Sequence, residues 1–303
     1  MILVTGATGA SGSAVIREFV RRELPVRALV RDPAKLATGA VPSSVQVVKG
    51  DMREPDTLVE ALDGVHRVLM ISPAAPDLVE TQCTFIDAAR RAGVAHIVKF
   101  SGRGCYPDSE FRFARMHGEI ERYLERSGLA WTHLRPSQFM HVYLREVPTI
   151  LAEGELRLPM ADARLAPVDV ADIAEVAVGV LHGDGHEGKR YEMTGPEALT
   201  MTEVAETISS VIGKPVRYVD VEPERKSEEL RDAGLGPFFV EALDELFRLR
   251  RRNLDESRVD LSTHETFGVT PTRFEDFVRR DAEVFLGVGA WTPRWPTGWR
   301  TAS

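Results

Sequence analysis

Met1-Ile2-Leu3-Val4-Thr5-Gly6-Ala7-Thr8-Gly9-Ala10-Ser11-Gly12 opens the chain and predicts its fold. Residues 2–4 are an apolar run that predicts a buried strand, and this run leads directly into the glycine pattern. Residues 13–20 follow with apolar side chains at helical spacing, with Val15 paired to Phe19 and Ile16 to Val20. A strand, a glycine turn and a helix in this order predict a dinucleotide-binding site.

The residues of this turn have separate roles in binding a diphosphate. Gly6 permits the tight turn, Gly9 lets the backbone approach the phosphates, and Gly12 lets the helix pack close to the strand. The phosphates then face unpaired N–H groups at the positive end of the helix. Further donors at this helix end come from Thr8, Ala10 and Ser11. The alternative is a glycine-rich turn without a ligand, and the flanking strand and helix favour the nucleotide.

Composition limits the class of partner. The chain has 303 residues and a net charge of −8, which argues against a nucleic-acid surface but leaves room for a small anionic ligand. Cys83 and Cys105 are too few for a disulfide framework. No apolar run reaches membrane-spanning length, and no signal peptide fits ahead of a strand at residue 2. We therefore expect a cytoplasmic protein with a small-molecule substrate and no nucleic-acid or membrane partner, a homodimer being one candidate assembly.

The end of the second expected strand, residues 26–30, predicts the cofactor type. In dinucleotide-binding folds an acidic residue here binds the ribose of NAD, whereas a basic residue accommodates the 2′-phosphate of NADP. Arg31 occupies this position, with Lys35 one helical turn beyond. Asp32 is an alternative ribose ligand, but it precedes Pro33 and suits the cap of a short helix. The charge pattern favours NADP over NAD.

Further strands are expected at residues 45–48, 67–72 and 96–101, with helices at 57–62 and 77–91 between them. Apolar strands that alternate with helices predict a doubly wound parallel α/β sheet of the Rossmann type. Ligands of such sheets lie beyond the carboxyl ends of the strands. The expected cofactor contacts at this edge, after the glycine turn and Arg31, are Asp51 and Met52 at the adenine and Ser72, Pro73 and Ser101 towards the nicotinamide.

Residues 110–128 predict a helix, and residues 131–135 a strand that ends in Pro136 and leads to Phe139. With these segments the chain resembles the NmrA-like branch of the atypical short-chain dehydrogenase/reductase superfamily over most of residues 1–220. The matching segments are residues 5–12, 30–33, 50–51, 100–102, 117–121, 134–136, 139–140 and 168–174. The resemblance implies a Rossmann domain with a small C-terminal domain that closes over the nicotinamide, and Pro136 and Phe139 as cofactor contacts.

The chain departs from the superfamily at the catalytic helix. Classical members carry Tyr-x-x-x-Lys there, and the resemblance places Phe113 at the Tyr position and His117 at the Lys position. Phenylalanine has no proton to donate, so the usual acid is absent. His117 is expected to hold the ribose, with Glu121 fixing its tautomer one helical turn away. The alternative is a solvated His and Glu on a polar helix face.

The sequence also predicts how the chain divides into two parts. Residues 1–140 are expected to form the NADP-binding domain, to which residues 164–195 return. Residues 141–163 and 196–303 are expected to form a smaller α+β substrate-binding region. In it, Thr200 and Glu203 form a capping-box motif at the start of a helix. The end of the chain carries Trp291, Trp295 and Trp299 among prolines, and its role is left open.

Other chemistries find little support. The sequence has no zinc-binding motif of the His-Glu-x-x-His or Cys-x-x-Cys type, so no metal is expected. Residues 101–104, Ser-Gly-Arg-Gly, lack the glycine before the serine that a nucleophile elbow requires. Tyr106 is the one phenol near the expected reaction end, either as a surrogate acid or as a loop aromatic that covers the pocket.

Two main functions fit these observations. The first is an NADP(H)-dependent oxidoreductase that passes hydride to a small apolar or aromatic acceptor such as a quinone or an enone. The second is a redox sensor that binds NADP(H) and reports its state to a protein partner without turnover, because some NmrA-like proteins act in this way. A non-redox isomerase or epimerase with tightly held cofactor is a third option. We favour the enzyme because residues 140–160 and the C-terminal third suffice for a substrate pocket.

Overall fold

Seven parallel strands form the main sheet of the molecule in the order β3-β2-β1-β4-β5-β6-β8. Their bounds are β1 Ile2–Val4, β2 Arg27–Val30, β3 Gln46–Lys49, β4 Arg67–Met70, β5 His96–Phe100, β6 Ala130–Pro136 and β8 Lys189–Met193. The structure is a computed structural model that describes residues 1–35, 41–252 and 256–288. It confirms the expected doubly wound parallel sheet.

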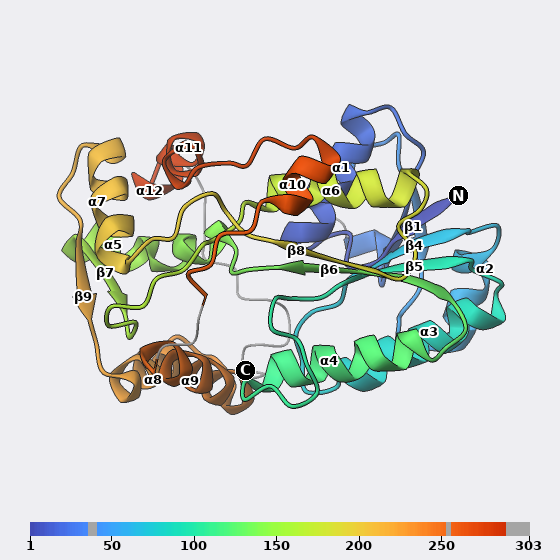
Figure 1. Cartoon of the computed structure of the whole chain (residues 1–303), viewed down its shortest axis with the longest axis horizontal. Coiled ribbons are helices and arrows are strands. Elements are labelled where there is room, and N and C mark those ends of the chain that lie inside the picture. Colours follow the sequence, from blue (N-terminus) through green and yellow to red (C-terminus); the bar gives the residue numbers. More distant parts are fainter. Residues whose placement is uncertain (36–40, 253–255, 289–303) are drawn as a thin grey trace.

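Helices cover both faces of this sheet (Figure 1). On one face lie α1 Ala10–Arg21, α6 Val170–His182 and α10 Ser262–Phe267. On the other face lie α2 Val59–Leu62, α3 Leu78–Arg91 and α4 Arg112–Glu125. The central strands read as continuous apolar runs because both of their faces are buried, as for Val68, Leu69 and Met70 at 0% exposure. Strand β5 is an exception, because it contains a charged residue, Lys99, that is also fully buried.

The remaining elements lie beyond the end at which β6 finishes (Figure 1). A second, two-stranded parallel sheet pairs β7 Glu155–Leu158 with β9 Arg217–Asp220. The helices of this part are α5 Val147–Glu153, α7 Met201–Ile212, α8 Pro223–Asp232, α9 Pro237–Arg251, α11 Phe274–Arg280 and α12 Ala282–Phe285. The capping box predicted for α7 is present, since the Thr200 and Glu203 side chains each bind the other's backbone N–H.

Some expected elements differ from those observed. The helix expected at residues 57–62 is a 3-10 turn, Pro55–Leu58, followed by the single turn of α2. Pro55 begins this turn, and the Thr57 hydroxyl binds the Glu54 carbonyl, so the backbone tightens locally. The helix expected at residues 110–128 is shorter, as the bounds of α4 show. The tryptophan-rich end, from residue 289 onward, lies outside the described residues. Among those that are described, no helix is long and apolar enough to span a membrane.

Candidate functional site

The glycine turn lies between β1 and α1. Gly6 adopts a left-handed conformation with φ of +60°, and its carbonyl accepts a hydrogen bond from the Gly9 N–H at 3.0 Å. A Cβ on Gly12 would lie 2.2 Å from the Gly6 carbonyl oxygen, so only glycine fits at this contact between turn and helix. The roles expected for Gly6 and Gly12 in shaping the turn agree with this geometry.

The N-terminus of α1 is open towards solvent. Its N-cap residue is Gly9, which offers no side-chain cap, and the first turn contains no acidic residue. Thr8, Gly9 and Ala10 are exposed, and Ser11 is half-buried. The first N–H groups of α1 therefore keep their positive potential without a carboxylate from the chain itself. This arrangement fits a diphosphate.

A threonine that sequence reasoning did not select joins the two central strands beneath this turn. The Thr5 hydroxyl donates to the Ile71 carbonyl at 2.6 Å and accepts from the Ile71 N–H at 2.8 Å. The next residue, Ser72, is half-buried and accepts a hydrogen bond from Gln82 at 2.9 Å, and Pro73 is exposed. The ends of β1 and β4 are thus held in register beside the expected cofactor site.

Arg31 and Asp32 follow the end of β2. The Asp32 carboxylate accepts a hydrogen bond from the Ala34 N–H at 3.1 Å, so Asp32 caps the 3-10 turn Pro33–Lys35 as expected. Arg31 is exposed, and it makes no ion pair with any residue that the structure describes. Its guanidinium is therefore available to an anionic ligand, and Lys35 ends the same turn.

Asp51 and Met52 follow the end of β3, and Asp51 has a partner that the sequence did not indicate. Arg53 donates to both Asp51 carboxylate oxygens, at 3.1 and 2.8 Å. These hydrogen bonds hold the pKa of Asp51 below its usual value. Met52 is only 8% exposed and belongs to the hydrophobic core. Arg53 adds a second guanidinium near Arg31 at this end of the sheet.

Towards the expected nicotinamide position, Ser101 follows β5 and lies buried beside the thiol of Cys105. Burial raises the pKa of the Cys105 thiol, which therefore stays protonated. Pro136 ends β6 and is buried, while the half-buried ring of Phe139 meets Phe100 edge to face at 6.0 Å. Because the strands are parallel, the predicted site residues that follow their carboxyl ends lie along one edge of the sheet.

Helix α4 carries Phe113, which the resemblance places where classical members have a tyrosine. Its ring is 7% exposed and packs edge to face on Phe238 of α9, with a centroid distance of 5.7 Å. Phe239 stacks on the same ring at 6.3 Å. Phe113 is therefore a core residue between α4 and α9.

His117 and Glu121 are not paired with each other, so the expected role of Glu121 is wrong. His117 Nδ1 lies 2.7 Å from Lys99 Nζ. The Glu121 carboxylate is bound by two nitrogens of Arg135, at 3.1 and 2.5 Å. The alternative of a solvated face is also wrong, because Glu121 is 3% exposed and His117 is half-buried. The spacing along α4 could not reveal partners contributed by β5 and β6.

Tyr106 lies over the guanidinium of Arg135, the partner of Glu121. Its hydroxyl is 3.4 Å from Arg135 Nη1, and its ring covers the guanidinium at 4.9 Å. The side chain is 50% exposed. Gly118 makes this loop position possible, because a Cβ there would lie 2.4 Å from the Tyr106 carbonyl carbon. The phenol thus covers a buried ion pair, and its role as an acid stays a prediction.

Glu121 also belongs to a group of three residues with metal-ligating atoms, together with Glu125 and His133. Glu121 is bound by Arg135, and Glu125 by Arg190. Burial lowers the pKa of His133 to about 2, so His133 is neutral. Two guanidinium groups already neutralise the carboxylates, so this cluster is an ion-pair network that disfavours a cation.

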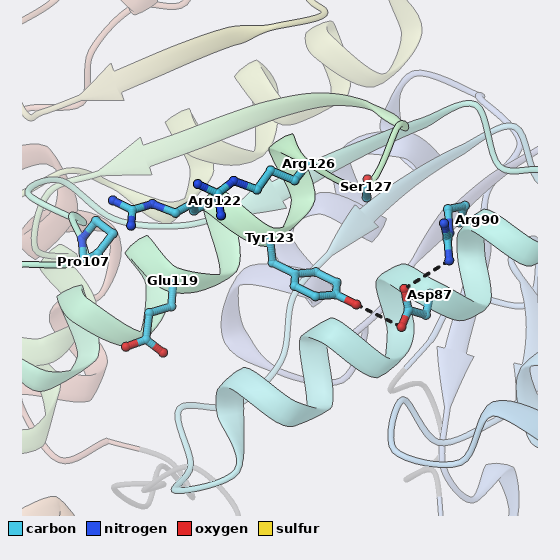
Figure 2. Close-up of a pocket in the computed structure, with 8 residues that line it drawn as sticks. All are labelled: Asp87, Arg90, Pro107, Glu119, Arg122, Tyr123, Arg126 and Ser127. Atoms are coloured by element: carbon cyan, nitrogen blue, oxygen red, sulfur yellow. Dashed lines mark hydrogen bonds and ion pairs between the residues drawn. The ribbon is translucent and has the colours of Figure 1, made fainter.

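Two surface cavities lie apart from most of the predicted site. One of about 380 Å³ lies between α3 and α4 (Figure 2) and is lined by Asp87, Arg90, Pro107, Glu119, Arg122, Tyr123, Arg126 and Ser127. A second of about 410 Å³ lies between α1 and α6, and Ala10 is the only predicted site residue in its lining. The predicted cofactor contacts instead follow the open edge of the sheet.

The family model described as NmrA-like family matches residues 1–278. The chain belongs to the NmrA-like family. Among its relatives is an NAD(P)H azoreductase of Xenophilus azovorans, 38% identical over 94% of this chain and 99% of the relative. A (4-alkanoyl-5-oxo-2,5-dihydrofuran-3-yl)methyl phosphate reductase of Streptomyces griseus is 36% identical over 94% of this chain and 99% of the relative.

A solved structure extends the similarity to the fold. The NADPH-dependent quinone oxidoreductase of Escherichia coli, in complex with NADPH, superimposes with a TM-score of 0.82 at 30% identity. The match covers 92% of this NmrA-like chain and 99% of the solved one. Family membership and the Rossmann-type fold expected from the sequence are both confirmed.

Proposed function

We propose that this NmrA-like protein is an NADP(H)-dependent oxidoreductase that passes hydride to a small apolar or aromatic acceptor such as a quinone or a conjugated enone. The observation that carries this proposal is the open, uncapped N-terminus of α1 behind the Gly6–Gly9–Gly12 turn, with Arg31 exposed at the end of β2. The relatives support it, because they are named as an azoreductase, a dihydrofuranone phosphate reductase and an NADPH-dependent quinone oxidoreductase.

The chain's own residues would hold the cofactor along the edge of the sheet. The N–H groups of α1, with the Thr8 and Ser11 hydroxyls, would bind the diphosphate. Arg31, assisted by Lys35, would bind the 2′-phosphate, and Asp51 and Met52 would lie at the adenine. The nicotinamide end would be bordered by Ser72, Pro73, Ser101, His117, Pro136 and Phe139. When bound, NADPH supplies a hydride ion at its nicotinamide ring.

The missing tyrosine determines the class of acceptor. Phe113 cannot donate a proton, and its ring is enclosed by Phe238 and Phe239. A simple ketone would form a localised alkoxide and lose the roughly hundredfold to ten-thousandfold rate gain that a placed acid supplies. A quinone or an enone spreads the negative charge over the product and needs less help. Phe139, whose half-buried ring follows β6, adds an apolar surface at the reaction end.

The domain organisation, the cellular location and the assembly of the protein are also proposals. Residues 141–163 and 196–303 would form the substrate-binding part that closes over the nicotinamide, and residues 1–140 with 164–195 the cofactor-binding part. We also propose a cytoplasmic location, with the homodimer as the assembly to test.

The test is a comparison of acceptors at equal NADPH concentration. Purified protein should oxidise NADPH with a water-soluble quinone at least about a hundredfold faster than with an isolated aliphatic ketone, the factor that a missing acid predicts. Gly12→Ala is the site control, because its Cβ would meet the Gly6 carbonyl. This variant should lose turnover while retaining its circular dichroism. Equal rates for both acceptors would refute the acceptor class, and no NADPH consumption with any acceptor would favour the sensor.

A further inference from the structure

Lys99 is a buried cation whose closest side-chain partner carries no negative charge. Its side chain is 0% exposed, and its Nζ lies 2.7 Å from His117 Nδ1 and 3.3 Å from the Phe100 carbonyl. The nearby Glu121 carboxylate is bound by Arg135 through both of its oxygens. Burying an ammonium group without a paired carboxylate is costly. Such a costly arrangement beside a predicted cofactor contact suggests a role in function.

The contact between Lys99 and His117 determines which imidazole nitrogen carries the proton. An ammonium group has donors and no acceptor, so Lys99 must donate to His117 Nδ1. The neutral imidazole then carries its own proton on Nε2. His117 is half-buried, and its Nε2 has no hydrogen-bond partner in the described part of the chain. The Nε2–H group is therefore left to donate to a bound molecule.

The surroundings keep this assignment stable near neutral pH. Burial lowers the pKa of Lys99 from its usual 10.5 to about 8, so its amine is mainly charged at pH 7. Burial, and then the charge of Lys99, hold the pKa of His117 well below its usual value, so the imidazole is neutral. The titratable and charged groups that face the pair come from α3, the loop after β5, α4 and β6, and they are Cys83, Cys105, Glu121, His133 and Arg135.

We propose that Lys99 is a positioning residue that fixes His117 as the Nε2–H tautomer, so that His117 donates a hydrogen bond to the ribose of the bound nicotinamide nucleotide. A lysine on β5 thus supplies the orientation that the sequence assigned to Glu121. The identity of the ligand rests on the proposed function, whereas the tautomer does not.

Nitrogen-15 NMR of the free protein tests the tautomer directly. His117→Gln identifies the His117 signals, and in the wild type at pH 7 these should show a proton on Nε2 and none on Nδ1. Lys99→Met should give a mixture of tautomers. Thr132→Val is the matched control, because it removes the hydroxyl partner of another buried histidine, His96, and should leave the His117 signals unchanged. A proton on Nδ1 in the wild type, or an unchanged tautomer in Lys99→Met, would overturn the proposal.

NADPH binding tests what the tautomer does. Losing one hydrogen bond should raise the Kd of Lys99→Met for NADPH by about tenfold at pH 7. Wild-type affinity should weaken above about pH 8 as Lys99 loses its proton, whereas the variant should show no such step. Unchanged affinity and an unchanged pH profile in Lys99→Met would overturn the role in binding. A wild type that binds no NADPH would refute the proposed function, and the NMR result would still decide the tautomer.

Discussion

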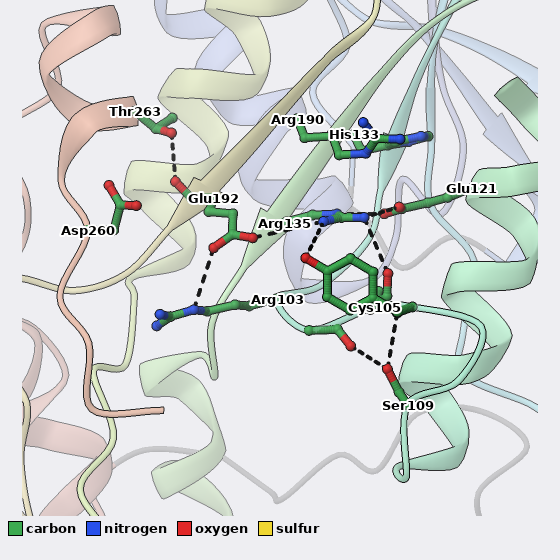
Figure 3. A network of polar contacts seen from close by, with 12 residues as sticks. Arg103, Cys105, Ser109, Glu121, His133, Arg135, Arg190, Glu192, Asp260 and Thr263 are labelled. Carbon is green, nitrogen blue, oxygen red and sulfur yellow. Dashed lines mark hydrogen bonds and ion pairs between the residues drawn. The ribbon is translucent and has the colours of Figure 1, made fainter. Parts of the chain in front are cut away.

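Two buried polar pairs join α4 to the sheet, one helical turn apart, and they differ in their balance of charge. Glu121 meets Arg135 of β6 in an ion pair in which both side chains are at most 5% exposed (Figure 3). His117 meets Lys99 of β5, and this pair carries a net positive charge because the imidazole is neutral. The two charges of the first pair cancel, whereas the second pair keeps the positive charge of Lys99.

The difference separates a structural contact from a functional one. In the Glu121–Arg135 pair each partner stabilises the other, and the ring of Tyr106 shields Arg135 from water. The charge of Lys99 is buried without a carboxylate, and this costs stability at neutral pH. The lowering of the Lys99 pKa by burial reports the same cost. We therefore expect opposite effects when one member of each pair is replaced by methionine.

Arg135→Met should have the largest effect on stability. The substitution leaves the Glu121 carboxylate buried and unpaired, which should lower the free energy of unfolding by about 3–5 kcal/mol. Urea denaturation at pH 7 measures it. The double variant Glu121→Met/Arg135→Met should recover most of the loss, since a buried ion pair replaced by apolar side chains is often tolerated. If Arg135→Met alone were as stable as the wild type, the charge of Arg135 would not be stabilising the buried Glu121 carboxylate.

Lys99→Met should have a smaller effect of the opposite sign. The shift of the Lys99 pKa from 10.5 to about 8 corresponds to about 3 kcal/mol, so the variant should be more stable than the wild type by up to about this amount at pH 7. Between about pH 8 and 10.5 the unfolded wild type binds more protons than the folded form, so its stability should rise with pH. The variant should lack this rise. A destabilised variant, or equal pH dependence in both proteins, would contradict the comparison.

These two regions also show how far the sequence alone could predict the molecule. The glycine turn was predictable because the roles of Gly6 and Gly12 depend on the backbone of a few consecutive residues. Asp32 was predictable as a cap for the same reason, since its partner is two residues away. His117 was selected by its position on a helix, but its partner Lys99 is 18 residues away on another element.

The errors in the site follow from the same limit. Glu121 was assigned to His117 because i, i+4 spacing is visible in a sequence, whereas the register of β6 against α4 is not. A lysine inside a largely apolar strand was the available signal for Lys99, because lysine is almost never fully buried without a partner. Arg53 was missed because only the folded chain shows that it binds Asp51.

The central claim is that a diphosphate rests on the first turn of α1 while Arg31 reads the 2′-phosphate. Calorimetric titration of the wild type and Arg31→Ala with NADPH and NADH tests it most directly. We predict that the wild type binds NADPH more tightly than NADH, and that Arg31→Ala weakens NADPH by about tenfold or more while leaving NADH unchanged, as loss of a hydrogen bond to a charged group implies. Equal weakening of both cofactors would contradict the role of Arg31, and a wild type that binds neither would contradict the whole site.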